Sequence, residues 1–279
     1  MKDRPIGVFD SGLGGLTVVR ELSAVLGGED IVYLGDSARV PYGIRSLSTV
    51  RQYATEAAQF LMRFEPKMIV VACNTASAAA IDLLEQTCPV DVVDVIRPSA
   101  AAAMDATDGP IGVIGTEATI ASGAYQKAIR LLDPSRTVDV AACPLLVPIV
   151  EEGRAEDDPI VLHVLTDYLQ RLQRVRPGAL ILGCTHYPLL AKAIGKLMGP
   201  EVSLIDSGRS AGTEARKRLM ASGLANPRTE GGTLTCFTTD NADRFRRLSQ
   251  RFGGRRVDQV KQIGTDELAA ASGTHPSMM

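Results

Sequence analysis

The chain has 279 residues, of which 45% are apolar, so it can bury a full core and is long enough for two domains. Its 30 basic and 32 acidic residues leave a net charge of −2, which excludes a general attraction to nucleic acid. The odd number of cysteines, five, argues against a disulfide framework and for reduced thiols.

Short apolar runs alternate along the chain with longer segments of helical periodicity. The runs that predict strands are, in chain order, Ile6–Phe9, Ile31–Leu34, Met68–Ala72, Val90–Val95, Ile111–Ile114, Val138–Ala142, Leu180–Leu182, Val202–Ile205 and Thr233–Thr238. The segments that predict helices are Leu16–Leu26, Thr49–Phe64, Ala78–Gln86, Ile120–Leu132, Pro159–Val175, Leu189–Leu197 and Ser207–Ser222. This alternation predicts parallel sheet with crossover helices, an α/β fold.

Two pairs of similar segments indicate an internal repeat. Ile6–Gly12 (IGVFDSG) resembles Ile111–Thr119 (IGVIGTEAT) at an offset of 105 positions, and the settings of Cys73 and Cys184 match at an offset of 111. These offsets are domain-sized and far exceed the roughly 20–50 residues of a solenoid unit. The repeat therefore predicts two related α/β halves that face each other.

The repeat places a domain boundary near residues 96–98, and a return of the chain near residues 206–208 would let the C-terminal segment complete the first domain. We therefore predict a first α/β domain of residues 1–96 and 208–266 and a second of residues 97–207. Residues 267–279 have little to bury, and we predict a disordered tail there.

Cys73 and Cys184 each follow a buried strand, in VVACNTAS and LILGCTHYP. In α/β sheets, ligands bind in the crevice at the carboxyl ends of the strands. A single cysteine is most often a small core residue, but both of these precede polar residues that a core strand would not contain. A helix N-terminus after each would favour the thiolate. The pair indicates an acid and a base on opposite faces of one small substrate, whereas Cys88, Cys143 and Cys236 are interpreted as core residues.

Asp10 and Ser11 end the first predicted strand and precede glycines at positions 12, 14 and 15, which let the backbone pass close to a ligand. The segment is not the dinucleotide fingerprint, because Thr17 stands at its third glycine position. It is not a P-loop either, because no Gly-Lys-Ser/Thr follows. Asp10 is either a helix cap or a functional carboxylate that accepts a substrate ammonium group or orients a thiol.

Asp36 and Ser37 repeat this arrangement of strand, acid and hydroxyl. The segment Pro41-Tyr42-Gly43 then predicts a tight, rigid turn that is suited to presenting backbone N–H groups to a carboxylate. An ordinary turn is equally compatible with these residues.

His186, in CTHYP, lies two residues after Cys184, where an imidazole could relay a proton or raise the thiolate fraction. His163 lies in a helical pattern and His275 near the C-terminus, and neither has such surroundings. A Cys-x-His zinc pair would need further ligands, which no C-x-x-C or H-x-x-x-H supplies at short range, so we predict no metal site.

Two charged stretches are interpreted as solvated surface. From the residues alone, Glu151 and Glu152 favour an exposed helix start, and the arginines of Arg244–Arg256 favour the wet side of an amphipathic helix rather than a phosphate site. The buried stripe of that helix would be Phe245, Leu248 and Phe252. No apolar run reaches the roughly 20 residues of a membrane span, and residues 1–10 show no signal-peptide pattern, so we expect a cytoplasmic protein without membrane contact.

Four stretches together resemble the glutamate racemases of the cofactor-independent aspartate/glutamate racemase superfamily. They are GVFDSGLGGLTVVREL, YLGDSARVPYG, VVACNTAS and ILGCTHYPLL, and the resemblance extends to about residue 208. It implies two α/β domains with parallel-type sheets, related by pseudo-twofold symmetry, with the substrate in the cleft between them. It also implies cofactor-free interconversion of L- and D-glutamate, which supplies D-glutamate for peptidoglycan, and commonly a homodimer.

The resemblance also assigns roles to residues. Cys73 and Cys184 are implied to be the two acid/base residues. The implied substrate-binding residues are Asp10, Ser11, Tyr42, Gly43, Asn74, Thr75, Thr185 and His186. Beside the cysteines and Asp10, the residues implied to assist catalysis are Asp36, Glu152 and His186, with Glu152 taken in preference to Glu151. To the substrate contacts we add Pro41, from the same turn as Tyr42, and Thr116.

Racemisation removes the Cα proton from one face and returns a proton to the other, so one thiol must be ionised while the other is protonated. An unperturbed thiol, with a pKa of about 8.5, is only a few per cent ionised at pH 7, a cost of about 2 kcal/mol. Asp10 near Cys73, or His186 near Cys184, could offset that cost. No lysine in the four stretches suggests a pyridoxal cofactor, so we expect hydrogen-bond donors to stabilise the carbanion. The candidates are Asn74, Thr75, Thr116 and Thr185.

Two other functions use the same features. A racemase of another acidic amino acid, such as aspartate, would keep both thiols. A non-catalytic amino-acid-binding protein could use the same crevice, but it would have no need of the thiols. A role in binding a nucleic-acid enzyme finds no support in the near-neutral charge.

Overall fold

The computed structural model describes residues 1–254 and 257–271. The strands are β1 (Ile6–Asp10), β2 (Ile31–Gly35), β3 (Met68–Val71), β4 (Asp91–Asp94), β5 (Ile111–Gly115), β6 (Val138–Ala142), β7 (Ala179–Gly183), β8 (Ser203–Asp206), β9 (Leu234–Thr238) and β10 (Gln259–Gln262). Within the described residues they form a larger sheet, in the order β10-β9-β2-β1-β3-β4, and a smaller sheet, in the order β6-β5-β7-β8. Every pairing between these strands is parallel.

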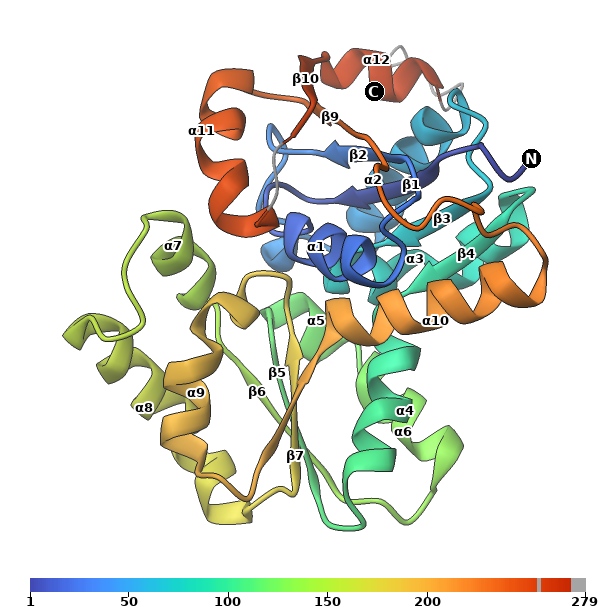
Figure 1. Cartoon of the computed structure of the whole chain (residues 1–279). Coiled ribbons are helices and arrows are strands. Elements are labelled where there is room, and N and C mark those ends of the chain that lie inside the picture. The colour runs from blue at the N-terminus through green and yellow to red at the C-terminus, as the bar shows by residue number, and fades with distance from the viewer. Residues whose placement is uncertain (255–256, 272–279) are drawn as a thin grey trace.

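The helices connect the strands and cover the sheets (Figure 1). They are α1 (Leu16–Val25), α2 (Leu47–Met62), α3 (Asn74–Thr87), α4 (Ile96–Ala106), α5 (Glu117–Ala121), α6 (Ala124–Leu132), α7 (Leu146–Glu151), α8 (Pro159–Val175), α9 (Ala191–Met198), α10 (Ser207–Ala221), α11 (Ala242–Gly253) and α12 (Thr265–Ala271). Two 3₁₀ turns are η1 (Tyr42–Ile44) and η2 (Tyr187–Leu190). The central strands β1, β3, β5 and β7 are wholly buried, as expected for parallel strands covered by helices.

The two sheets repeat one strand order. The run β2-β1-β3-β4 of the larger sheet corresponds to β6-β5-β7-β8 of the smaller sheet. The predicted internal repeat is thus present in the topology: β3 and β7, which precede the two cysteines, occupy equivalent places. The α/β fold with two parallel sheets is confirmed.

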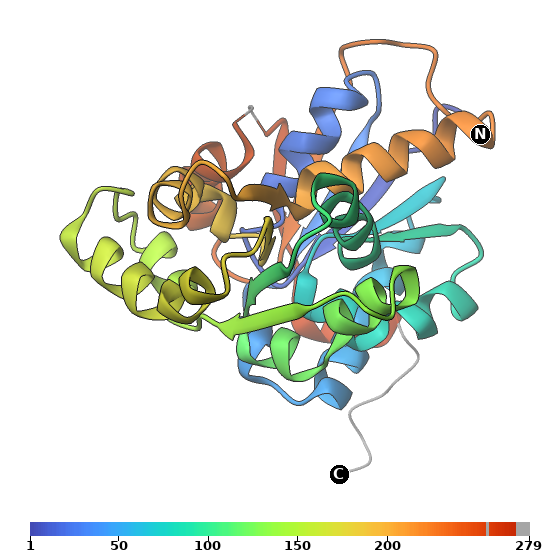
Figure 2. The same ribbon diagram turned by 90° about the horizontal axis from the view of Figure 1, so that it is seen from below.

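The chain crosses between the sheets twice. It enters the smaller sheet through α4 and returns through α10, which packs along α1, and β9 and β10 then join the larger sheet beside β2. Seen from below in Figure 2, α10 runs across the molecule next to α1. On this basis we propose the domain division of residues 1–96 with 208–266, and 97–207, and call the two parts the first and second domains.

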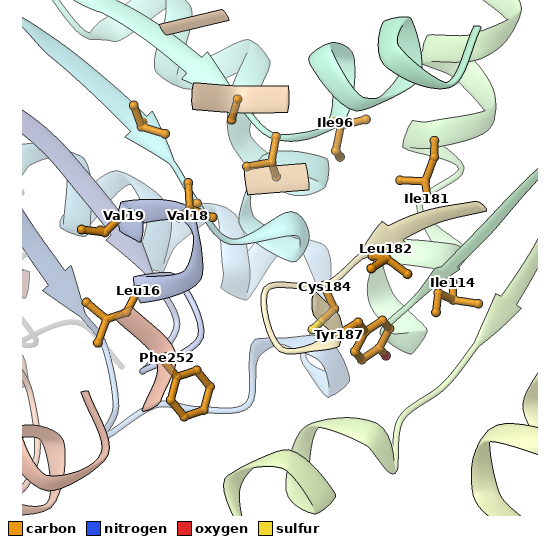
Figure 3. Close-up of a cluster of buried hydrophobic side chains, with 14 of the residues drawn as sticks. Leu16, Val18, Val19, Ile96, Ile114, Ile181, Leu182, Cys184, Tyr187 and Phe252 are labelled. Carbon is orange, nitrogen blue, oxygen red and sulfur yellow. The ribbon is translucent and has the colours of Figure 1, made fainter. Parts of the chain in front are cut away.

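A single apolar cluster continues from one domain into the other. Leu16 and Val18 of α1, in the first domain, belong to the same buried cluster as Ile114 and Ile181 of the smaller sheet. Figure 3 shows these side chains with Cys184 among them. The domains therefore adhere through core-like packing as well as through polar contacts.

The structure corrects several element predictions. Helix α4 was not predicted, because residues 96–98 were interpreted as a domain boundary. Proline is tolerated in the first turn, however, and the alanines that follow favour helix. The predicted helix Ile120–Leu132 is two helices, separated at Gly123, which has a φ of 68°. Residues 267–271, which were predicted to belong to a disordered tail, are part of α12, and the rest of that prediction, residues 272–279, lies outside the described residues. No helix in the described part of the chain is long and apolar enough to cross a membrane.

Candidate functional site

The two cysteines lie on a small cavity at the carboxyl ends of the central strands of both sheets. Its volume is about 30 Å³, room for about two water molecules. It is lined by Ser11, Val40, Pro41, Tyr42, Gly43, Cys73, Asn74, Thr75, Thr116, Val147, Cys184, Thr185 and His186. Most of the predicted site residues are therefore brought together, from segments of both domains. Because the cavity is smaller than an amino acid, the domains must part to admit one.

Cys73 is the N-cap residue of α3, and its Sγ accepts a hydrogen bond from Ala76 N at 3.4 Å. Although a helix N-terminus favours the thiolate, burial raises the pKa of Cys73 to about 12, and the negative charge of Asp10 acts in the same direction. Burial thus outweighs the helix dipole. At neutral pH, the closed structure favours the protonated thiol at Cys73.

Asp10 lies at the end of β1, behind the cavity wall. Its Oδ2 accepts a hydrogen bond from Gly12 N at 3.0 Å, while its buried Oδ1 has no hydrogen-bond partner among the described residues. Burial raises the pKa of Asp10, against the opposing effects of the His186 charge and the nearby backbone N–H groups. Burial therefore makes the carboxyl group of Asp10 easier to protonate than an exposed one, close to Cys73.

Cys184 follows β7 and has different neighbours from Cys73. Its Sγ lies 3.9 Å from His186 Nδ1, and His186 Nε2 lies 3.2 Å from Glu151 Oε1. Burial alone would lower the pKa of His186, but hydrogen bonds with Cys184 and Glu151 raise it to about 10. A protonated imidazole therefore lies next to Cys184 Sγ. The α-helix expected directly after Cys184 is not there, since η2 precedes α9.

Hydroxyl groups of both domains meet at one wall of the cavity. Thr75 Oγ1 lies 3.0 Å from Thr116 Oγ1 and 3.0 Å from Thr119 Oγ1. Thr119 was missed in the sequence, although its position three residues after the N-cap Thr116 is a capping pattern that could have indicated it.

Asn74 of the first domain makes hydrogen bonds to residues of the second domain. Its Nδ2 donates to Tyr125 Oη at 2.8 Å and to Ser207 Oγ at 3.3 Å. Tyr125 and Ser207 were not predicted, and no short-range pattern marks them, since they lie 51 and 133 positions from Asn74. The amide oxygen Oδ1 has no partner among the described residues, so Asn74 offers the site an acceptor rather than the expected donor.

Asp36, which was predicted to assist catalysis, does not line the cavity. Its carboxylate accepts hydrogen bonds from Tyr42 Oη at 2.5 Å, Thr239 Oγ1 at 2.9 Å and Arg39 Nε at 2.7 Å. Arg39 also pairs with Glu56. Asp36 therefore holds the loop that brings Tyr42 and Gly43 to the cavity.

Glu152, which was predicted to assist catalysis in preference to Glu151, lies on the surface instead. Its side chain is 64% exposed and pairs with Arg154 at the surface, whereas the neighbouring Glu151 is 20% exposed and contacts His186. The reason is helical phase: α7 ends at Glu151, which still lies on the face directed toward η2, and the next residue turns to solvent. The interpretation of this pair as solvated surface holds for Glu152 and fails for Glu151.

Two glycines allow the loops of opposite domains to touch. A Cβ atom at Gly14 would overlap Thr185 Oγ1 and lie 2.5 Å from His186 Cε1, and one at Gly43 would lie 2.6 Å from Thr116 Cβ. Near Gly14, the Thr17 hydroxyl lies 2.9 Å from the carbonyl oxygen of Thr185, across the domain boundary. Closure of the site thus depends on positions that have no side chain.

Together, these features define a two-sheet α/β protein with one thiol from each sheet on a closed cavity. The comparisons with known proteins agree with this class. A family model described as Asp/Glu/hydantoin racemase matches residues 7–215. The chain therefore belongs to the Asp/Glu/hydantoin racemase family.

Full-length relatives are similar to the chain in sequence and in structure. A curated glutamate racemase from Chlorobaculum tepidum is 45% identical over 264 residues, which cover 94% of this chain and 97% of the relative. A crystal structure of a glutamate racemase isoform from Bacillus anthracis has a TM-score of 0.90 at 39% identity, covering 94% of this chain and 98% of that one. The Francisella tularensis glutamate racemase in complex with D-glutamate has a TM-score of 0.88 at 36% identity, covering 95% and 99%.

Proposed function

We propose that this protein is a glutamate racemase, which interconverts L- and D-glutamate by proton transfer between Cα and the two cysteines. The observation that carries the proposal is the delivery of Cys73 and Cys184 to one cavity from equivalent strands of two sheets. The names of the full-length relatives support glutamate as the substrate. The supply of D-glutamate for peptidoglycan, a cytoplasmic location and a homodimer, all expected from the resemblance, remain parts of this proposal.

The surroundings of the thiols suggest how the cycle starts. Cys184 lies beside a His186 whose pKa is raised to about 10, whereas burial raises the pKa of Cys73 to about 12. The closed enzyme thus favours a thiol at Cys73, and we assign the role of the first base to Cys184, which lies beside the imidazolium. The Cys184 thiolate takes the Cα proton from one face, and the C–H electron pair stays on Cα. Cys73 then donates its proton to the opposite face, forming the new C–H bond and leaving Cys73 as the thiolate.

The remaining cavity residues bind and stabilise the substrate. Thr75, Thr116 and Thr185 provide hydroxyl groups for the charge that develops on the carbanion and its carboxylate, in a largely buried site. The unpaired amide oxygen of Asn74, which lines the cavity, suits the substrate ammonium group. Asp10, behind the cavity wall, acts on the site through its charge near Cys73. The turn at Tyr42 and Gly43 serves a carboxylate.

The purified protein is expected to racemise L-glutamate in D₂O without added cofactor. Circular dichroism would show the signal decay to zero, and mass spectrometry would show deuterium at Cα. L-Aspartate, followed in parallel, identifies the substrate. If only aspartate racemises, the substrate assignment fails while the two-thiol mechanism stands. If neither amino acid exchanges its Cα proton, the protein is a binding protein that uses the same crevice.

Glu151→Gln is expected to lower kcat about tenfold, because a hydrogen bond to a charged group contributes about 1.5–3 kcal/mol. The substitution keeps the shape of the side chain and removes the charge that stabilises the His186 imidazolium. Glu152→Gln is the matched control, and it should leave kcat within about twofold of the unchanged protein, since its surface ion pair contributes little. Steady-state racemisation of both variants is the measurement. A larger loss in Glu152→Gln would restore Glu152 to the assisting role.

A further inference from the structure

Glu151 is contacted from both domains. Its Oε1 lies 3.2 Å from His186 Nε2 in its own domain, and its Oε2 lies 3.7 Å from the guanidinium of Arg244, which belongs to α11 of the first domain. The chain of contacts runs from a half-exposed arginine, through a carboxylate that is 20% exposed, to a buried imidazole next to Cys184. Arg244 lies outside residues 7–215, the segment that the family model matches.

Helix α11 touches the same region at two further points. The ring of Phe252 packs edge-on against His186, with 5.4 Å between the ring centroids. Arg251 donates a hydrogen bond to the carbonyl oxygen of Arg154 at 3.1 Å, just beyond α7. Figure 1 shows α11 and α7 facing each other from the two domains. Arg244 is thus fixed on a helix that is itself docked against the His186 region.

We propose that Arg244 is a positioning residue, which holds Glu151 in the orientation that keeps His186 against Cys184. This inference rests on the proposed function of Cys184 as an acid/base residue. It also makes that function dependent on domain closure, because Arg244 and Glu151 meet only across the domain boundary. When the domains part, the carboxylate loses its partner from the first domain.

The charges around His186 determine in which direction Arg244 would move the pKa of His186. Cys184 and Glu151 contact the ring, Asp10 acts on it through its charge, and Arg244 lies beyond Glu151. The hydrogen bond with His186 lowers the pKa of Glu151 despite its partial burial, and the charge of Arg244 adds to this effect. As a bare cation, Arg244 would disfavour the imidazolium. As the anchor of Glu151, it favours the imidazolium, so the two effects have opposite signs.

The test compares Arg244→Ala, Arg244→Lys and Arg247→Ala, in the full-length protein. Arg247 is an exposed arginine on the same helix and serves as the control. The protonation of His186 is followed against pH by NMR of the protein with isotope-labelled histidine rings, which needs no reagent to enter the cavity. In Arg244→Ala, the pKa of His186 is expected to fall by about half a unit, the range of a half-exposed ion pair. In the same variant, kcat/KM for racemisation falls about two- to fivefold.

Arg244→Lys should restore most of the His186 pKa and most of kcat/KM. Arg247→Ala should match the unchanged protein in both. An unchanged pKa of His186 in Arg244→Ala would overturn the proposal and leave Arg244 as a solvated surface residue. A rise in the pKa of His186 would also overturn it, because removal of a bare cation favours the imidazolium. The NMR measurement does not require turnover, so failure of the unchanged protein to racemise glutamate would count against the proposed function separately.

Discussion

Replacing either Cys73 or Cys184 by alanine is expected to abolish racemisation, because each thiol is the acid or base for one face of the substrate. Loss of a positioned acid or base costs about 10²–10⁴-fold. The two variants should nevertheless differ from each other. Each retains the thiol for one face, so each should wash solvent deuterium into one enantiomer of glutamate without inverting it, and the enantiomer should change with the variant.

Proton NMR of L- and D-glutamate in D₂O, each incubated with each variant, measures this exchange. Cys88→Ala, at the end of α3 and away from the cavity, is the control and should racemise normally. Far-UV circular dichroism checks that the fold is intact. Appreciable racemisation by either cavity variant, or exchange of the same enantiomer by both, would contradict the two-thiol mechanism.

Gly14→Ala is expected to lower kcat/KM by about 100-fold, because the added methyl group meets the site from the opposite domain. It would overlap Thr185 Oγ1 and press on the His186 ring, both of which are held by their own hydrogen bonds. An error of about 1 Å in the placement of catalytic groups can cost that much. The effect should come from incomplete closure, since Gly14 has no positive φ that an alanine would strain.

Gly12→Ala is the matched control on the same loop. A Cβ atom there would meet Val40 Cγ2 at 3.6 Å, an ordinary contact, so activity should stay within about twofold. Steady-state kinetics and small-angle X-ray scattering of both variants separate a kinetic loss from a change of shape. Full activity in Gly14→Ala would show that the loops do not need this close approach.

The sequence predicted the structure correctly where a short run of residues determines both the element and the position of a site residue. Buried runs of branched residues predicted nearly every strand, and the polar residues after Cys73 and Cys184 placed both thiols at the carboxyl ends of strands, as found. Strand β10 was missed because its residues, QVKQ, are mostly polar and exposed, and it forms by pairing with β9 at the edge of the sheet.

Predictions failed where a distant partner decides the direction of a side chain. Asp36 has the same local pattern as Asp10, yet its carboxylate turns to Tyr42 and to Thr239, which is 203 positions away. The amphipathic pattern of α11 correctly predicted that Phe245 and Phe252 are buried. It could not show that an arginine on the wet face reaches Glu151, because that contact exists only once the two domains have met.

Because the chain leaves the larger sheet and later returns to it, the two sheets can be completed at different times during synthesis on the ribosome. All strands of the smaller sheet are present once Asp206 has been made, whereas the larger sheet, which the chain begins, still waits for β9 at Leu234–Thr238. The smaller sheet can therefore be completed before the larger one, in contrast to the usual progression, in which the N-terminal unit folds first during synthesis. Helix α11 emerges later still, so a nascent or prematurely terminated chain carries both thiols without the helix that reaches Glu151. The contact between α11 and Glu151 thus forms only after the segments that carry both thiols have been translated.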